Sequence, residues 1–291
     1  MSRRFALLVN PAAADGRALR ALPAVHAELD LLAAPHRTVT TRSVEHARQE
    51  AARAAESGET VLALGGDGLL RPLAGALRGT ESALALVPCG RGNDFARVLE
   101  IPEEAGAATR VAVHGPERLL DVADVDGTPF VGIASFGFDS DANRIANETR
   151  LIKGSAVYLY ATLRALAAWK PARFTVSVDG ERHELLGYSV AVGNSKAYGG
   201  GMFMLPEAEL DDGLLDVMLS KRASKLRFLR ELPKVFKGAH LDSHYVEFLR
   251  GAVVEVASDR PFVIYADGDP IGATPATVRV ESRCLRVVVP S

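Results

Sequence analysis

The sequence has little cysteine, little excess charge and no long apolar run. Its two cysteines, Cys89 and Cys284, lie far apart in the 291 residues. This spacing argues against a disulfide framework or a metal cluster and is typical of reduced thiols in a cytoplasmic protein. A formal net charge of −2 excludes a global field that attracts nucleic acid. No stretch approaches the ~20 apolar residues of a membrane span, so we expect a lipid ligand to be met transiently at the membrane surface.

Enough apolar residues are present to form two buried cores. Hydrophobic residues make up 48% of the chain and charged residues 24%, as in ordinary globular proteins. A length of 291 residues is comfortable for two domains of ~100–200 residues each. The apolar run at residues 5–9 is shorter than the ~7–15 residues of a signal-peptide core, and it predicts a buried first strand.

Residues 1–122 alternate short apolar runs with helical segments. The helix expected over residues 17–34 should break at Pro23, and Ser43 should cap the next helix. Continuously apolar strands that alternate with helices predict an α/β domain, in which a parallel sheet is covered on both faces. The expected strands are 5–9, 37–41, 60–64 and 83–87.

Residues 123–291 differ because β-rich runs follow one another with few helices. The dipeptides Asp126-Gly127 and Asp179-Gly180 are hairpin signals. We therefore expect an antiparallel β-sandwich domain that is interrupted by helices over residues 158–169 and 225–237. The last strand either stays in this domain or returns to the first domain. The expected strands are 119–125, 129–134, 173–179, 185–192, 214–219, 252–257, 262–265, 277–280 and 285–289.

The strongest local signal is the turn Gly65-Gly66-Asp67-Gly68, which ends an apolar strand. Glycines let the backbone approach a ligand closely, and the carboxyl end of a parallel strand is where open α/β sheets bind ligands. Bare amides before a helix suit a phosphate, and Asp67 can hold Mg²⁺ beside it. A plain β-turn with an Asx cap is the alternative for this motif alone.

Two further strand ends carry similar turns. Asn10-Pro11 follows the first strand, and Gly90-Arg91-Gly92-Asn93 follows the fourth. Because the carboxyl ends of parallel strands share one edge of a sheet, we expect these turns to lie together. A shared edge of this kind favours a phosphate-bearing ligand over three unrelated turns.

Several longer segments occur in a fixed order along the chain. They are Val9-Asn10-Pro11, Gly65-Gly66-Asp67-Gly68, Gly90-x-Gly92-Asn93-Asp94-Phe95-Ala96-Arg97, Gly137-Phe138-Asp139, Gly199-Gly200-Gly201 with Pro206, Asp212-Gly213-Leu214-Leu215-Asp216-Val217 and Asp267-Gly268-Asp269. With these segments the sequence resembles the bacterial diacylglycerol kinase family, relatives of the sphingosine and ceramide kinases. NAD kinase is a poorer match, because a Thr-Pro-Thr-Gly-Ser-Thr-like segment is lacking.

The resemblance implies that the first domain binds ATP. It also implies an ATP-dependent lipid kinase that phosphorylates a lipid hydroxyl, with diacylglycerol as the default acceptor. A kinase of a soluble or other lipid acceptor, and a nucleotide-binding protein with weak or no catalysis, are the alternatives. The implied nucleotide-binding residues are Asn10, Pro11, Arg17, Thr40 or Thr41, Gly65, Gly66, Asp67, Gly68, Leu69, Arg71, Gly90, Arg91, Gly92 and Asn93.

The resemblance also implies catalytic roles. Asp67, Asp94 and Asp121 match acidic positions around a catalytic Mg²⁺, and Arg97 matches a basic residue that supports them. Asp269 matches the catalytic base, which must take the proton of the acceptor hydroxyl. Asp67 is the rival base. We favour Asp269 as the base and Asp67 as the Mg²⁺ anchor.

A second Mg²⁺ site, of structural kind, is implied for the second domain. Its ligands would be Glu209, Asp212 and the carbonyl of Leu214. Without the resemblance, this segment reads as a simple acidic turn.

The match is poorest beside the glycine turn. Where the family has Thr directly after the glycine turn, this chain has Leu69. Where the family then has Asn-Glu, this chain has Arg71-Pro72. A further Thr of the family, in the next strand-end turn, is replaced by Arg91. Arginine can donate two parallel hydrogen bonds to phosphate oxygens. Arg71 and Arg91 would therefore replace the family's polar contacts to the phosphates by charged contacts. The alternative is that nucleotide binding has weakened.

The segment 221–237 is basic and amphipathic. It suits either anionic lipid headgroups or a helix packed on the sandwich with a solvated basic face, and we favour the packed helix. We expect no nucleic-acid partner. A homodimer is compatible with the exposed β-edges expected in the second domain, but the sequence carries almost no information on oligomeric state.

Overall fold

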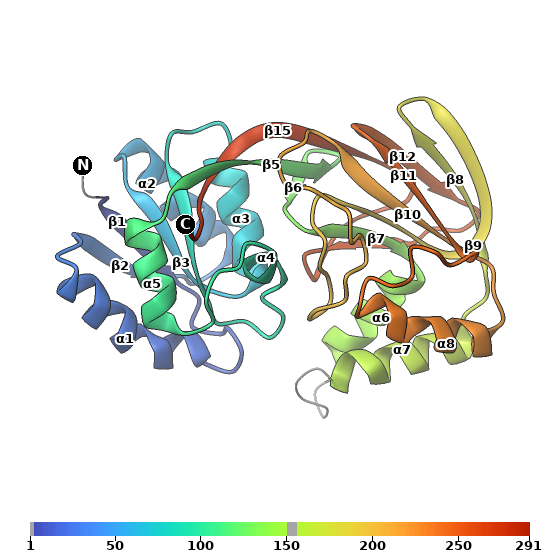
Figure 1. Ribbon diagram of the computed structural model, residues 1–291, viewed down its shortest axis with the longest axis horizontal. Helices are drawn as coiled ribbons and strands as arrows, with labels where there is room; N and C mark the ends of the chain where they lie inside the picture. The colour runs from blue at the N-terminus through green and yellow to red at the C-terminus, as the bar shows by residue number, and fades with distance from the viewer. Residues whose placement is uncertain (1–2, 150–155) are drawn as a thin grey trace. The chain divides into compact units, whose positions relative to one another are not determined.

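The computed structural model describes residues 3–149 and 156–291. The chain divides into two compact units, residues 1–122 with 281–291, and residues 123–280 (Figure 1). The last strand, β15 (Ala276–Val288), therefore begins in the second unit and ends in the first. The homodimer stays a prediction.

The first unit is built on a parallel sheet. Its spatial order is β15, β4, β3, β1, β2, and every residue of β1, β3 and β4 is buried. Helix α1 packs beside α5, and α2 packs beside α3. This arrangement confirms the predicted α/β architecture. The elements are β1 (Phe5–Val9), α1 (Arg17–Leu31), β2 (His36–Thr40), α2 (Val44–Glu56), β3 (Thr60–Gly65), α3 (Asp67–Leu77), β4 (Ala83–Pro88), α4 (Asp94–Val98), α5 (Ala105–His114) and the start of β5 (Glu117–Val125).

Two local predictions for this unit had different outcomes. Ser43 caps α2 as expected, since its hydroxyl accepts a hydrogen bond from His46 N at 3.0 Å. The predicted break at Pro23 is wrong, because α1 runs through it. Pro23 lies on the exposed side of the helix near Leu19, so the carbonyl that loses its N–H partner can be hydrated.

The second unit is an antiparallel sheet that curls around its own core, which confirms the predicted sandwich-like class. The spatial order is β14, β13, β7, β9, β8, β12, β15, and β10 pairs with β9 and β11. Helices α6, α7 and α8 lie side by side (Figure 1). The elements are β6 (Thr128–Phe130), β7 (Ile133–Gly137), α6 (Phe138–Glu148), α7 (Ala156–Ala168), β8 (Ala172–Val178), β9 (Glu181–Gly193), β10 (Leu215–Lys221), α8 (Lys225–Val235), β11 (Val246–Gly251), β12 (Val253–Ser258), β13 (Val263–Ala266) and β14 (Asp269–Ala273).

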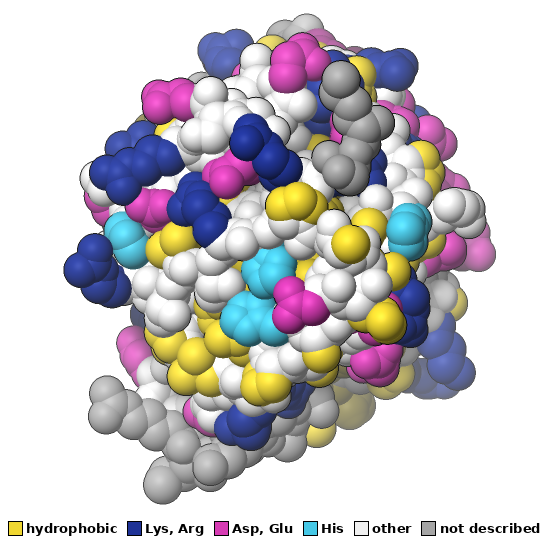
Figure 2. Space-filling model, turned by 90° about the vertical axis from the view of Figure 1, so that its left-hand side faces the viewer, with side chains coloured by type: hydrophobic (Ala, Val, Ile, Leu, Met, Phe, Trp, Pro, Cys, Tyr) yellow, Lys and Arg dark blue, Asp and Glu magenta, His cyan; other side chains and the backbone are white. Residues whose placement is uncertain are grey.

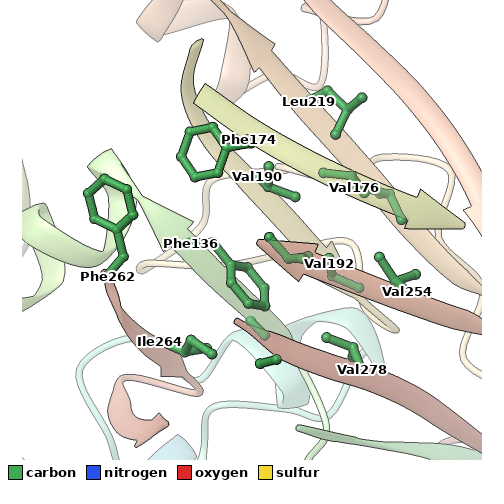
Figure 3. Close-up of a cluster of buried hydrophobic side chains, with 14 of the residues drawn as sticks. Phe136, Phe174, Val176, Val190, Val192, Leu219, Val254, Phe262, Ile264 and Val278 are labelled. Atoms are coloured by element: carbon green, nitrogen blue, oxygen red, sulfur yellow. The ribbon is translucent and has the colours of Figure 1, made fainter. Parts of the chain in front are cut away.

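The core of this unit is made of aromatic and β-branched side chains from strands far apart in the sequence. Figure 3 shows Phe136, Phe174 and Ile264 turned inward from three different strands. Alternate residues of β8 are buried, as the period of two in a strand requires. The sheet is thus held together mainly by apolar burial on its inner face.

The hairpins were predicted well, but several element boundaries were not. Asp126-Gly127 and Asp179-Gly180 form two-residue turns with positive φ at both residues, as type I′ hairpins require. Helix α6 and strands β11 and β14 were not predicted. The two strands predicted at 277–280 and 285–289 form one strand, β15, which passes through Arg283 at φ 50°.

The surface of the first unit carries charges of both signs. On the face drawn in Figure 2, basic and acidic side chains are interspersed, and histidine side chains gather near its centre. His26 and His36 stack with ring centroids 5.3 Å apart. None of the helices in the described part of the chain is both long and apolar enough to cross a bilayer.

Candidate active site

The strand-end turns of the first unit meet at one edge of its sheet. Val9, the last residue of β1, is in register with Thr40 on one side and Leu64 on the other. Across the next pair of strands, Gly65 is in register with Pro88, and Cys89 N donates to Gly65 O at 2.6 Å. The shared edge places the residues after β1, β3 and β4 next to each other.

Two glycines at this edge approach each other closely. A Cβ added to Gly66 would lie 2.6 Å from Gly90 Cα, and one added to Gly90 would lie 2.6 Å from Gly66 Cα. No side chain fits there without moving a backbone segment. Gly66, Asp67 and Asn93 line a small cleft of about 200 Å³, counting its open mouth. Glycine is thus required here for space, since neither residue has a positive φ.

The loop at Gly90 is fixed by two side chains. Asn93, at φ 51°, accepts a hydrogen bond from Gly90 N through Oδ1 at 2.7 Å and donates one to Gly90 O at 3.4 Å. Arg17, the first residue of α1, donates to the same carbonyl at 3.0 Å. These bonds hold the loop in one conformation without a ligand, as a pre-formed phosphate site requires.

Asp67 lies where the two turns meet. Its carboxylate accepts hydrogen bonds from the backbone N–H groups of Asp94, Phe95 and Asn93. Burial raises the pKa of Asp67, and the nearby carboxylate of Asp94 raises it further, while the three N–H groups lower it. Its Oδ1 atom is shielded from solvent and accepts no hydrogen bond from the described residues. A hard oxygen of this kind, close to a second carboxylate, fits a divalent cation such as Mg²⁺.

Arg97 and Asp94 form an ion pair on the short helix α4. Arg97 Nη1 lies 2.7 Å from Asp94 Oδ1, and Nη2 donates to Gly92 O at 3.1 Å. Asp121 is buried in β5, where its carboxylate accepts from Arg283 N of β15 at 2.6 Å. Arg97 therefore binds one carboxylate of the predicted set, and Asp121 binds the last strand.

The other predicted nucleotide residues surround this edge in different ways. Asn10 Oδ1 accepts from Ala12 N at 3.1 Å, which shapes the turn at Pro11. Thr41 is buried, with its hydroxyl bonded to Val9 O at 3.0 Å, whereas Thr40 is exposed. The structure thus separates these two threonines: only Thr40 has its side chain in solvent.

The poorly matching residues lie in α3 and in the Gly90 loop. Leu69 is buried against Gly65, and Arg71 is partly buried one residue before Pro72. Because Pro72 has no N–H, it leaves the carbonyl of the exposed Gly68 without its helical donor. Arg91 is exposed and lies 3.7 Å from Asp15 Oδ1.

In the second unit, Asp267 and Gly268 form a two-residue hairpin turn that leads into Asp269. Asp267 and Gly268 have φ of 51° and 87°, and Ala266 pairs with Asp269 across the turn. The carboxylate of Asp267 accepts from Val131 N at 2.9 Å and Gly132 N at 2.8 Å. Asp269, the first residue of β14, therefore follows a turn that the Asp267 carboxylate anchors to Val131 and Gly132.

The predicted second metal site lies before β10. Asp212 accepts a hydrogen bond from Leu214 N at 3.0 Å and pairs with Arg250, whose Nε also lies 3.3 Å from Asp216 Oδ1. Burial raises the pKa of Asp216 to about 6, against the opposing effect of Arg250. Glu209 is exposed. Within residues 3–149 and 156–291, no group of three or more carboxylate, histidine or cysteine side chains is arranged to hold a metal, and the site stays a prediction.

Known proteins resemble both units of the chain. Residues 4–125 match the diacylglycerol kinase catalytic domain, and residues 132–289 match the YegS C-terminal NAD kinase beta sandwich-like domain. The chain belongs to the diacylglycerol kinase family. Membership makes it a phosphotransferase of the lipid kinase class that uses ATP.

Relatives match over most of their length. A diacylglycerol kinase of Mycobacterium tuberculosis (strain ATCC 25618 / H37Rv) is 32% identical over 292 residues, covering 97% of this chain and 94% of the relative. A "probable lipid kinase YegS-like" of Chromohalobacter salexigens is 34% identical over 233 residues, covering 76% and 73%. A crystal structure of a diacylglycerol kinase from Bacillus anthracis has a TM-score of 0.80 at 22% identity, covering 99% of this chain and 97% of that chain, and it supports the fold.

Several residues of the candidate sites were not predicted from the sequence. No sequence motif pointed to Asp15, which faces Arg91. The same holds for Arg250, which pairs with the carboxylates of Asp212 and Asp216. Asp267 did carry a signal, because Asp-Gly between β-rich runs predicts a hairpin, but its contacts with Val131 and Gly132 depend on the fold.

Proposed function

We propose that this lipid kinase transfers the γ-phosphoryl group of Mg²⁺-bound ATP to the hydroxyl of a membrane lipid, with diacylglycerol as the acceptor. The observation that carries the proposal is the edge formed by Gly66, Gly90 and Asp67, where bare backbone and an unpartnered carboxylate oxygen lie together. A nucleotide phosphate with its metal ion complements both features.

In this proposal the backbone around Gly66 and Gly90 binds the phosphates, and Asn93 and Arg17 keep the Gly90 loop in place. Asp67 and Asp94 would hold Mg²⁺, which offsets the charge that develops on the transferred group. Arg97 keeps Asp94 oriented through its bond of 2.7 Å.

Asp269 takes the proton of the acceptor hydroxyl as the hydroxyl oxygen bonds to the γ-phosphorus. The bond from that phosphorus to the bridging oxygen breaks, and ADP leaves. Asp267 orients Asp269 through the hairpin. Asp67 is the less suitable base, because this proposal assigns its remaining oxygen, Oδ1, to the metal ion.

The proposal includes peripheral contact with a membrane. Helix α8 has no fully buried residue, and Leu226 on it is 80% exposed beside Lys225 and Arg227. Phe236, just after the helix, is 50% exposed. Exposed apolar side chains among cations are suited to an anionic lipid surface.

A kinase assay tests the proposed reaction. The full chain is incubated with Mg²⁺ and γ-labelled ATP, and with mixed micelles of diacylglycerol, monoacylglycerol, ceramide or sphingosine; glycerol is the soluble control. We expect label in the organic phase with diacylglycerol and none with glycerol. Transfer to glycerol alone, or to no acceptor at all, overturns the proposal.

A further inference from the structure

The second unit has a broad, open cleft on α6 and α7 that the proposed reaction leaves unused. Counting its open mouth, the cleft encloses about 1980 Å³. Its walls come from α6, from α7 with the residues that follow it, and from the segment before β13. The charged side chains that line it are Arg144, Arg164, Lys170, Arg260, Asp141 and Glu148. Because cations outnumber carboxylates in this lining, we call it the cationic cleft.

The two carboxylates of the cationic cleft both pair with one of its cations. Arg144 Nη1 lies 3.1 Å from Glu148 Oε2, and Arg144 Nη2 lies 3.7 Å from Asp141 Oδ1. Arg164 and Lys170, by contrast, form no ion pair with any carboxylate among the described residues. The cleft therefore keeps an excess of positive charge that an anion can offset.

Arg260 is fixed in position mainly by backbone and aromatic groups. Its Nη2 donates to Lys170 O at 2.5 Å. The guanidinium carbon lies 5.4 Å from the ring centroid of Trp169 and 5.0 Å from that of Phe262, within the range of cation–π contact. Its ion pair with Asp259 spans 3.8 Å at the surface, and such pairs are weak. A guanidinium held in this way is preorganised to donate paired hydrogen bonds to a phosphate.

Trp169 adds a hydrogen-bond donor that no described residue satisfies. The side chain lines the cationic cleft but is only 6% exposed. Its ring packs against Tyr188 and Phe262, with centroids 6.5 and 5.6 Å away, and its Nε1–H has no acceptor in the described part of the chain. An indole nitrogen can only donate, and a buried donor without a partner is costly. A ligand that ends in acceptor oxygens would satisfy it.

The donors and charges of the cationic cleft fit a phosphomonoester better than other groups. The guanidinium, ammonium and indole N–H groups all donate hydrogen bonds, and none of them accepts. A phosphomonoester carries a charge of about −1.5 to −2 at neutral pH and three terminal acceptor oxygens, whereas a carboxylate carries a single charge on two oxygens. A neutral hydroxyl or amide would leave the excess positive charge unmatched.

From this geometry we infer that the cationic cleft is a second phosphate site, which binds a phosphomonoester through Lys170, Arg260 and the indole N–H of Trp169. Such a group has two sources, the head of a phosphorylated lipid and a soluble phosphate ester. Only the lipid source rests on the proposed function, because the proposed reaction would release a lipid phosphomonoester. The site itself requires no nucleotide and no phosphate transfer, and it uses side chains where the strand-end turns use backbone.

Tryptophan fluorescence tests the inference, because Trp169 is the only tryptophan of the chain. The full chain is titrated without nucleotide, once with sn-glycerol 3-phosphate and once with glycerol in a buffer of matched ionic strength. We expect glycerol 3-phosphate to cause a saturable change in the emission of Trp169 and glycerol to cause none. The absence of a saturable change with every phosphomonoester tried overturns the inference.

A lipid arm separates the two sources of the phosphate. Dihexanoyl phosphatidate, below its micellar limit, is compared with glycerol 3-phosphate in the same titration. Binding of the phosphatidate at least about tenfold more tightly identifies a lipid phosphate as the ligand, because Ile145 and Ala168 of the lining can contact its chains. Equal affinity identifies a soluble phosphate ester. Dihexanoylglycerol, which lacks the phosphate, should leave the emission unchanged.

Two variants that each remove one positive charge locate the binding. Lys170→Gln removes a cation of the cleft, and loss of one charge-assisted hydrogen bond should weaken glycerol 3-phosphate binding about tenfold. Arg279→Gln removes a charge at an exposed position of β15 outside the cleft and should leave the affinity unchanged. Circular dichroism checks that both variants fold. Unchanged affinity in a folded Lys170→Gln, or an equal loss in both variants, overturns the inference.

The indole N–H can be removed without removing the aromatic ring. Trp169→Phe keeps a ring beside the Arg260 guanidinium but has no donor. In a calorimetric titration with dihexanoyl phosphatidate, we expect the variant to bind about tenfold more weakly than the wild type, as the loss of a hydrogen bond to a charged group predicts. Unchanged affinity in a folded variant contradicts the assigned role of the indole.

The inference and the proposed function fail separately. The fluorescence titrations contain no ATP, so a saturable response without any phosphate transfer in the kinase assay retains the cleft site and rejects the kinase proposal. Transfer of label to diacylglycerol without a response to any phosphomonoester retains the kinase and rejects the cationic cleft as a phosphate site.

Discussion

The strand-end turns of the first unit and the cationic cleft of the second unit are built from different parts of the chain. Around Gly66 and Gly90 the surface is formed by backbone atoms. The two turns can approach this closely because neither glycine carries a side chain. Around Arg260 and Trp169 the surface is formed by side chains. A surface of bare backbone suits a group common to all nucleotides, as proposed for the first unit, whereas a surface of side chains can be altered by single substitutions.

The largest effect should come from Asp269, which belongs to neither surface. Asp269→Asn removes the proposed proton acceptor and should lower kcat by about 10²–10⁴-fold, the usual contribution of general-base catalysis. Nucleotide affinity, measured by calorimetry, should not change. Asp259→Asn, at a half-exposed side chain, is the control. Full turnover in Asp269→Asn would make Asp67 the base.

The next effect tests whether the first site depends on bare backbone. Gly66→Ala places a Cβ 2.6 Å from Gly90 Cα, so the two turns must separate. A displacement of about 1 Å at a reacting centre costs about 100-fold in rate, and we expect kcat/KM for ATP to fall by about that factor.

Gly79→Ala is the matched control in the same unit. Gly79 has φ +73° but open space around it, so the substitution should lower stability by about 1 kcal/mol and leave kcat/KM unchanged. If both alanines reduce activity equally, general destabilisation explains the loss and the close approach of the turns does not.

A smaller effect is expected from the anchored hairpin. Asp267→Ala removes the acceptor for Val131 N and Gly132 N, and loss of hydrogen bonds to a charged group should loosen the turn and lower kcat about tenfold. Asp126→Ala removes a similar anchor, which binds Thr277 N at 3.1 Å. The control should lose comparable stability with normal kcat, as followed by thermal unfolding and steady-state rates.

The smallest effect concerns pH and Asp139 of α6, one of the helices that line the cationic cleft. Burial raises the pKa of Asp139 from 3.8 to about 6, so the folded chain holds this proton at pH values where the unfolded chain has released it. Its contribution to the free energy of unfolding should therefore fall as pH rises through this interval, by up to about 3 kcal/mol in total.

Urea unfolding of Asp139→Asn between about pH 4 and pH 7 measures this contribution. The variant should lose less stability than the wild type over this range, because asparagine does not titrate. Asp141→Asn, at a half-exposed carboxylate in the same helix, should follow the wild type. Parallel curves for all three proteins would mean that Asp139 is solvated.

The sequence allowed prediction of elements whose pattern is simple. β1, β3 and β4 are apolar throughout and are buried throughout, and the Asp-Gly turns have the φ values that this dipeptide favours. Helix α6 was not predicted because its buried residues include Ser140 and Asn143, which hide the apolar period. β15 appeared as two strands because its middle, around Ser282, is polar and exposed.

The same distinction applies to the candidate sites. The glycine turns could be found because close backbone approach needs one residue type, and that need appears as a motif. The cationic cleft could not be found, since its lining comes from segments between residues 141 and 262 whose individual residues are ordinary.

The path of β15 has a consequence for synthesis. Its final residues, Arg286 and Val287, pair with Ala83 and Leu84 of β4, and Val289 N donates to Pro116 O at 3.0 Å. The first unit therefore lacks a strand until β15, which follows the second unit in the sequence, has left the ribosome. The first unit, whose early strands are translated first, is thus completed last, and the edge formed by its strand-end turns should mature only after the second unit has been translated.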